Sequence, residues 1–199
     1  MNQDQLQALL TKVQQGALAV PDALHRLRTL PYENLGFASL DHHRALRQGF
    51  PEVIFCEGKT VSQVVAIAKT LLRKNNALLA TRVEPSVARA LLRVSKRAVY
   101  HEAARVVAIA PPKLVRRGAV LIVTAGTADI PVAEEARVTA DIMGSKTDTL
   151  YDVGVAGLHR LLGQQERLHD ARALVVVAGM DGVLPSVATA DTSAGWPHC

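Results

Sequence analysis

The chain of 199 residues has few cysteines and few aromatic side chains, and each scarcity excludes a class of protein. Two cysteines cannot build the disulfide framework of a small secreted domain. Aromatic residues make up 4% of the chain, so Ala, Val and Leu supply most of its 49% hydrophobic residues, which favours α/β layers over an aromatic-rich β-sandwich. No apolar run reaches the ~18 residues of a membrane span, and the N-terminus has no signal-peptide pattern. We therefore expect a soluble, cytoplasmic protein.

Basic residues are concentrated in the first half of the chain. Residues 1–100 contain 14 Lys or Arg and 7 Asp or Glu, which gives a net charge of +7. Residues 101–199 contain 9 Lys or Arg and 11 Asp or Glu, which gives −2. The cations are dispersed along the chain and are not interleaved with aromatic side chains. This pattern favours phosphorylated small molecules over nucleic acid as partners.

Residues 1–115 are expected to form N-terminal helices followed by a small α/β domain. The helical and strand periodicities predict helices at 5–16, 21–27, 60–72 and 84–94, and short strands at 53–55, 77–80 and 106–109. Between them, residues 32–52 are dense in charge, Gly and Pro, and we expect a long, irregular, functional loop there. Two prolines and a Lys/Arg cluster predict the domain boundary near residue 115.

Residues 116–187 alternate between strand and helix patterns separated by glycine loops. The patterns predict strands at 119–123, 149–153 and 173–177, and helices at 131–143, at 157–168 and from Leu184 onward. This alternation is typical of a doubly wound parallel sheet of the flavodoxin or Rossmann kind. Ligands of such sheets bind at the carboxyl ends of the strands, so the loops at 124–130 and 178–186 are the best site candidates.

Several single residues leave alternatives open. Asp129 lies where it could accept hydrogen bonds from ribose hydroxyls, or it could simply cap the following helix. The pair His42–His43 after Asp41 could be half of a metal site, although surface or hydrogen-bonding histidines fit the spacing better. Cys56 lies beside a predicted strand, where a buried, inert thiol is expected, and Cys199 is the last residue. P-loop, HExxH, CxxC and GxSxG motifs are all missing.

Longer motifs connect the predicted loops to a known family. They are YENLGFA at 32–38, DHHR at 41–44, GFPEVI at 49–54, EGKT at 57–60, AGTADIP at 125–131, YDVGVAGLHR at 151–160 and AGMDGVLPSV at 178–187. Together they resemble the LarB family, which helps to build the nickel-pincer nucleotide cofactor and has a C-terminal domain like that of PurE, the aminoimidazole ribonucleotide carboxylase of purine (IMP) biosynthesis.

The resemblance implies a carboxylase and hydrolase acting on nicotinic acid adenine dinucleotide. The pyridinium ring would be carboxylated with CO2 or bicarbonate, and the phosphoanhydride would be hydrolysed with Mg²⁺, giving pyridinium-3,5-biscarboxylic acid mononucleotide and AMP. Because the ring is electron-poor, a cysteine thiolate would first add to it and a base would later remove the ring proton. The resemblance also implies a homo-oligomer, an octamer in the family, with no membrane or nucleic-acid partner.

The family's functional residues can be placed on matching positions of this sequence. Asp181 would be the catalytic base, although LarB proteins usually have Glu there. The metal ligands are left open. The residues implied in substrate or nucleotide binding are Asp41, His42, Arg44, Arg47, Glu52, Lys59, Gly126, Thr127, Asp129, Gly179, Pro185 and Ser186.

Two other functions are weighed against this one. A PurE-type carboxylase of aminoimidazole ribonucleotide would need two histidines, but Val183 stands at the first position and His159 lies too far along its helix for the second. A non-catalytic nucleotide-binding subunit is the other alternative, because residues 188–199 have no regular periodicity and are expected to be an aberrant tail. We expect that tail to lack the attacking cysteine, to leave residues 175–177 as an apolar sheet edge, and to prevent turnover by this chain.

Overall fold

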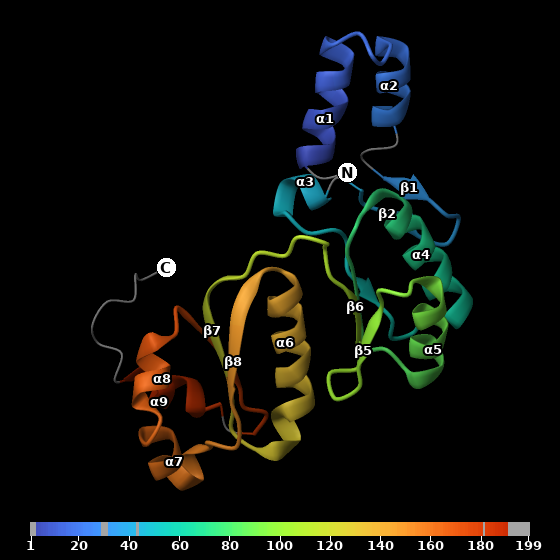
Figure 1. The fold of residues 1–199 in the computed structure, drawn as a ribbon. Helices are drawn as coiled ribbons and strands as arrows, with labels where there is room; N and C mark the ends of the chain where they lie inside the picture. The colour runs from blue at the N-terminus through green and yellow to red at the C-terminus, as the bar shows by residue number, and fades with distance from the viewer. Residues whose placement is uncertain (1–2, 29–31, 43, 181, 191–199) are drawn as a thin grey trace. The chain divides into compact units, whose positions relative to one another are not determined.

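The computed structural model describes residues 3–28, 32–42, 44–180 and 182–190 (Figure 1). The chain divides into two compact units, one of residues 1–100 with 107–112 and one of residues 101–106 with 113–199. The main division, between residues 112 and 113, lies close to the boundary expected near 115. Mixed and parallel sheets packed against helices confirm the α/β class. None of the described helices is long and apolar enough to cross a membrane.

The first part of the chain forms a helical pair, a small hairpin and a mixed sheet. Its elements are α1 (Gln3–Gln14), α2 (Val20–Arg28), β1 (Glu33–Asn34), β2 (Ser39–Leu40), α3 (Arg44–Gln48), β3 (Ile54–Phe55), α4 (Val61–Lys74), β4 (Leu78–Thr81), α5 (Pro85–Val94), β5 (Val99–His101) and β6 (Val106–Ile109). The four-stranded sheet has the order β3-β4-β6-β5, with β4 parallel to β3 and antiparallel to β6.

Burial explains why these apolar runs become central strands. All residues of β4 and β6 are buried, so both faces of these strands are covered. The helices α4 and α5 bury Leu71 and Leu91 against Leu78 and Ile109 in one continuous hydrophobic cluster. The predicted start of α4 at Thr60 is confirmed, because this residue caps the helix.

The cap of α4 gives a direct stability prediction. The Gln63 amide donates to Thr60 Oγ1 at 3.3 Å, and the Thr60 amide donates to Gln63 Oε1 at 2.9 Å, which together form a capping box. We expect Thr60→Ala to lower the free energy of unfolding by about 1 kcal/mol, because the Gln63 amide loses its acceptor, Thr60 Oγ1. Thr60→Ser keeps the hydroxyl and should be close to wild type in the same urea titration. Equal losses in both variants would contradict the capping role.

The second part of the chain forms a parallel sheet between two helical layers. Its elements are β7 (Arg117–Thr124), the short 3₁₀ helix η1 (Thr127–Asp129), α6 (Ile130–Ile142), β8 (Ser145–Leu150), η2 (Val155–Gly157), α7 (Leu158–Leu162), α8 (Gln165–Asp170), β9 (Ala173–Val177) and α9 (Leu184–Ala190). The order is β8-β7-β9, and both neighbours are parallel to β7. Helix α6 covers one face, and α7, α8 and α9 cover the other (Figure 1). The doubly wound arrangement predicted for residues 116–187 is therefore present.

Two predicted elements of this sheet are placed differently in the structure. Strand β8 spans 145–150 and so begins earlier than the predicted 149–153. It is an outer strand in which exposed polar side chains alternate with half-buried polar ones, and it therefore gives little hydrophobic signal. The predicted helix at 157–168 is two helices, since α7 ends at Leu162, before Gly163, and α8 begins at Gln165. Glycine disfavours a continuous helix there.

Three further corrections concern segments read as irregular or missed. The loop at 32–52 contains the antiparallel pair β1–β2 and the short helix α3, and β5 was not predicted at all. Helix α9 continues to Ala190 and buries Ala188, so the first residues of the segment expected to be aberrant belong to the fold. The remainder, 191–199, lies outside the described residues. Strand β9 is the other outer strand of its sheet, and the predicted apolar edge at 175–177 is half-buried.

Candidate functional site

The loops after β7, β8 and β9 meet at one edge of the parallel sheet. The Ala125 amide donates to the Val177 carbonyl at 3.0 Å, and the Gly154 amide donates to the Ala125 carbonyl at 2.8 Å. A Cβ atom at Gly154 would lie 2.6 Å from that Ala125 oxygen, so the close approach of the two loops requires glycine. We call residues 124–130, 151–157 and 178–180 together the carboxyl rim. It contains the first of the two loops that the sequence indicated as site candidates, 124–130, and the start of the second, 178–186.

Asp129 joins two of these loops through its carboxylate. Its Oδ2 accepts from the Gly126 amide at 3.0 Å, and its Oδ1 accepts from the Gly179 amide at 3.2 Å. The carboxylate makes no hydrogen bond that caps α6, but its bond to the Gly126 amide caps η1, the 3₁₀ turn directly before α6. The helix-capping alternative therefore applies to η1 and not to α6. Asp129 instead holds the β7 and β9 loops together at the point where the crossovers leave for opposite faces. Its contact with a ribose stays a prediction.

A second polar pair lies on the rim after β8, and sequence reasoning missed it. The Asp152 amide donates to the buried Oγ1 of Thr124 at 3.0 Å, which holds Asp152 in a left-handed conformation with φ of 58°. Arg160 Nη1 donates to Asp152 Oδ2 at 2.5 Å. A Cβ atom at Gly157 would lie 2.6 Å from Arg160 Nε, so glycine leaves room for the guanidinium. The motif at 151–160 was the available signal, but nothing in it showed this pairing.

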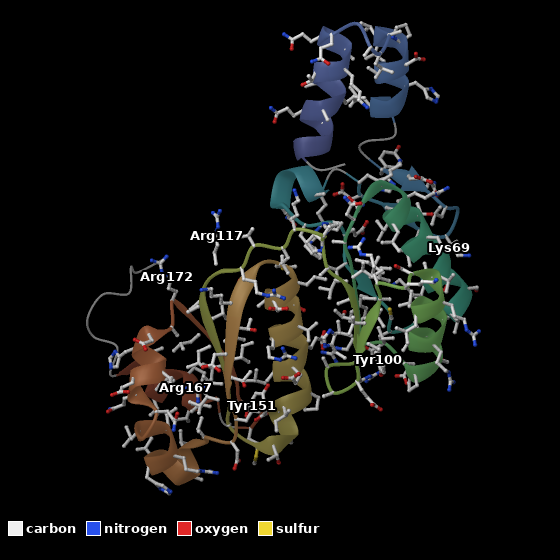
Figure 2. All side chains as sticks on the ribbon, in the orientation of Figure 1. Lys69, Tyr100, Arg117, Tyr151, Arg167 and Arg172 are labelled. Carbon is white, nitrogen blue, oxygen red and sulfur yellow. The ribbon has the colours of Figure 1, made fainter. Side chains whose placement is uncertain are left out.

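Beside the rim, Glu134 of α6 is hydrogen-bonded to Tyr151, the residue after β8, which is labelled in Figure 2. The Tyr151 hydroxyl donates to Glu134 Oε1, and Arg137 Nε and Nη2 donate to the two carboxylate oxygens at 2.8 Å and 2.8 Å. The Arg137 hydrogen bonds hold the pKa of Glu134 below its usual value, despite partial burial. Burial and the Glu134 carboxylate raise the pKa of Tyr151. Glu134 is therefore ionised and Tyr151 protonated at neutral pH, which fixes the end of β8 against α6.

The remaining predicted rim residues are placed as follows. Gly126 is half-buried, and Thr127 and Gly179 are exposed. The amides of Gly126 and Gly179 donate to Asp129, and Thr127 follows Gly126 in the chain. Pro185 and Ser186 are exposed in the first turn of α9. Asp181, the predicted base, lies outside the described residues.

In the first unit, three predicted nucleotide contacts are hydrogen-bonded to one another. Asp41 Oδ1 accepts from the Arg44 amide at 3.0 Å at the start of α3, and the Asp41 amide donates to Glu52 Oε2 at 2.7 Å. These bonds order the loop between β2 and β3. A nucleotide contact by Asp41, Arg44 or Glu52 stays a prediction. The side chain of Arg47 lies outside the described part of the chain.

His42 is a buried, hydrogen-bonded residue. Its side chain is 1% exposed, and its Nε2 lies 3.1 Å from Glu33 Oε2. Glu33 also pairs with Arg73 at 3.0 Å and with Lys74 at 3.2 Å. The Glu33 carboxylate therefore contacts two cationic side chains in addition to His42. Burial, and then the nearby Lys74, lower the pKa of His42. The hydrogen-bonding interpretation of this histidine is confirmed, and its burial disfavours the nucleotide contact that the resemblance implied.

Lys59 and Cys56 lie at the end of β3. Lys59 donates from Nζ to the Phe55 carbonyl at 2.6 Å. Because its side chain is exposed, a ligand can still reach it. Cys56 is 4% exposed, and burial raises the pKa of its thiol to about 11. Thiolate, the reactive form, is therefore scarce at neutral pH. The expectation of a buried, inert thiol is confirmed.

Among residues 3–28, 32–42, 44–180 and 182–190, no group of three or more His, Cys, Asp or Glu side chains converges on a common point. On the rim, both oxygens of Asp129 accept backbone amides and Asp152 faces Arg160. Mg²⁺ prefers several oxygen ligands, and substrate phosphates supply part of its shell in many enzymes. We assign no step to the metal, and its involvement stays a prediction.

These features define an α/β protein with a parallel sheet and a rim of hydrogen-bonded loops at its carboxyl edge. Residues 32–111 match the LarB/PurE-like N-terminal domain. The chain is also 34% identical over 193 residues to the uncharacterized protein MJ0165 of Methanocaldococcus jannaschii, an alignment that covers 92% of this chain and 75% of the relative. The chain therefore belongs to the family of that protein and contains a LarB/PurE-like N-terminal domain.

Proposed function

We propose that this chain binds nicotinic acid adenine dinucleotide, the substrate of the LarB-type reaction, in which the pyridinium ring is carboxylated and the phosphoanhydride is hydrolysed. The observation on which the proposal rests is the match of residues 32–111 to the LarB/PurE-like N-terminal domain. The products would be pyridinium-3,5-biscarboxylic acid mononucleotide and AMP. The substrate and the activity are proposals, whereas the domain is a finding.

The overall change replaces one ring hydrogen and splits one anhydride. CO2 adds at a ring carbon, the proton of that carbon leaves to a base, and the ring regains its aromaticity. In the hydrolysis, water adds at phosphorus, the P–O–P bond breaks, and AMP leaves with one oxygen of the bridge or of the water. Neither half needs an oxidant or a reductant.

The carboxyl rim suits the phosphate and ribose part of this substrate. The small residues around Gly126 and Gly179 allow a ligand to approach the backbone closely. The Arg160 side chain is 41% exposed and pairs with Asp152 of the third loop of the rim, and guanidinium groups pair well with phosphate oxygens. Asp129 keeps the two glycine loops at a fixed separation, which preorganises the rim for binding.

Carboxylation of the ring requires a nucleophile that adds to the pyridinium, and the described residues offer no suitable one. Cys56 is the cysteine of the described chain, and its burial and raised pKa of about 11 make it unsuited to add to a pyridinium ring. The other cysteine, Cys199, lies outside the described residues. We therefore expect the chain to bind the dinucleotide without turnover.

Binding and chemistry can be tested on the same preparation. Isothermal titration with nicotinic acid adenine dinucleotide should show saturable binding that AMP competes away, and mass spectrometry after addition of bicarbonate and Mg²⁺ should show no AMP. Undetectable binding would overturn the proposal. AMP release abolished by Cys199→Ser would overturn the expected lack of turnover. Carboxylation of aminoimidazole ribonucleotide, offered in parallel, would favour the PurE-type alternative, and binding of AMP alone would favour a non-catalytic nucleotide-binding subunit.

A further inference from the structure

The positive charge of the first half of the chain lies almost wholly in one segment. Residues 61–100 contain eight Lys or Arg and a single acidic residue, Glu84, whereas residues 1–60 contain six basic and six acidic residues. The segment includes the neighbouring helices α4 and α5, which lie side by side over the mixed sheet (Figure 1). A local charge of +7 thus exceeds the +5 of the whole chain.

Some of these cationic side chains form ion pairs or hydrogen bonds within the first unit. Arg73 and Lys74 pair with Glu33, and Arg97 donates to the Asn76 and Ala110 carbonyls. Four other cations are exposed on α4, on α5 and just beyond α5, and we call them the basic face. They are Lys69, Arg89, Arg93 and Lys96. Within the described chain no acidic side chain forms an ion pair with any of the four, so their charge is directed to the solvent.

Apolar side chains lie among these cations. Lys69 of the basic face, labelled in Figure 2, and Arg73, which pairs with Glu33, border an open hollow of about 630 Å³. Its other lining residues are Ala66, Thr70, Leu72 and Val94. Leu72 and Val94 are half-buried, and Leu92 on α5 is 41% exposed. A surface with an apolar floor and a cationic border fits a partner that is both acidic and amphipathic.

We propose that the basic face of α4 and α5 docks an acidic, amphipathic helical segment of a partner protein. Carboxylates spaced along such a helix would face Lys69, Arg93 and their neighbours, while its apolar side chains would cover the hollow at Leu72 and Val94. Nucleic acid fits this surface less well, because residues 61–94 contain no aromatic side chain on which a base could stack. This docking site is independent of the rim and of the reaction proposed above.

The proposal can be tested with a synthetic helix as probe. A fluorescent peptide of about 15 residues, with Glu on one face and Leu on the other, is titrated with the full chain and followed by anisotropy. Binding should weaken when the salt concentration rises from about 50 mM to about 200 mM. Lys69→Glu combined with Arg93→Glu should weaken it about tenfold or more. Lys146→Glu combined with Arg172→Glu, an equal charge change at exposed positions of the second unit, should leave it unchanged.

Two further probes decide the class of partner. A scrambled peptide of the same composition keeps the charge but loses the amphipathic face, and a single-stranded oligonucleotide of equal charge replaces the peptide altogether. Weaker binding of both supports the proposal. It would be overturned by equal binding of the scrambled peptide, by tighter oligonucleotide binding that depends on Lys69 and Arg93, or by a loss of binding in the control variant as large as in the test variant. Thermal unfolding of all variants verifies that they remain folded.

Discussion

Asp129→Asn is expected to weaken dinucleotide binding about tenfold or more and to lower the free energy of unfolding by about 1–3 kcal/mol. The carboxylate accepts the Gly126 and Gly179 amides with different oxygens, whereas an amide side chain offers only one acceptor oxygen and turns an NH2 group toward the other donor. One loop of the rim would then lose its connection to the other. Isothermal titration measures the affinity, and urea unfolding measures the stability.

A matched substitution separates the junction from a general effect of charge. Asp170→Asn removes one negative charge from an exposed position at the end of α8 and should change neither quantity appreciably. A variant at Asp129 that is destabilised but binds the dinucleotide normally would show that the rim is not the binding site, without contradicting the structure. An Asp129→Asn protein with wild-type stability would contradict the hydrogen-bonded junction itself.

The second large effect is expected from His42, as a loss of stability in mild acid. Burial lowers the pKa of His42 in the folded chain below its ordinary value of 6.5. The unfolded chain therefore binds the proton first, so the stability that neutral His42 contributes is present above pH 6.5 and is lost as the pH falls through the folded pKa. Within that window the free energy of unfolding should fall by up to about 1.4 kcal/mol per pH unit.

The variant His42→Gln should flatten this dependence, because glutamine can hydrogen-bond to Glu33 but does not titrate. Its unfolding free energy at about pH 7.5 should be about 1–3 kcal/mol below that of wild type, and the difference should shrink at about pH 5.5. His159→Gln, at an exposed histidine, is the control. His101 also has a lowered pKa and contributes to both slopes, so only the difference between wild type and His42→Gln tests the residue. Parallel slopes in the two proteins would contradict the prediction.

The bounds of the helices and strands were predicted well where the hydrophobic pattern of the sequence is strong and poorly where it is weak. Strand β7 and helix α4 were expected close to their observed bounds, since a buried run and a capped amphipathic helix carry their signal locally. Strand β8 was expected too late in the chain because an outer strand exposes polar side chains such as Lys146. The β1–β2 pair consists of two-residue strands, too short to produce any periodicity.

The candidate site was predicted in outline but not in its connections. Glycine loops after two predicted strands were sufficient to indicate the rim, because parallel strands end at a common edge. The Asp152–Arg160 pair and the Glu134–Tyr151 contact were missed, since the partners belong to different elements. The first pair forms when α7 turns back over the loop after β8, and the second forms where α6 packs beside β8. Asp129 was recognised as important, while its actual role, holding Gly179 from fifty residues away, was not.

The sequence by itself determined the α/β class, the loops that follow the parallel strands and the inert nature of Cys56. All of these follow from the local order of apolar, glycine and charged residues, which is readable along the chain. Only the tertiary structure decided which polar groups remain available to a ligand and which are engaged within the protein, as His42 is with Glu33. A hydrogen bond depends on distance in space, and folding brings together groups that the sequence keeps far apart.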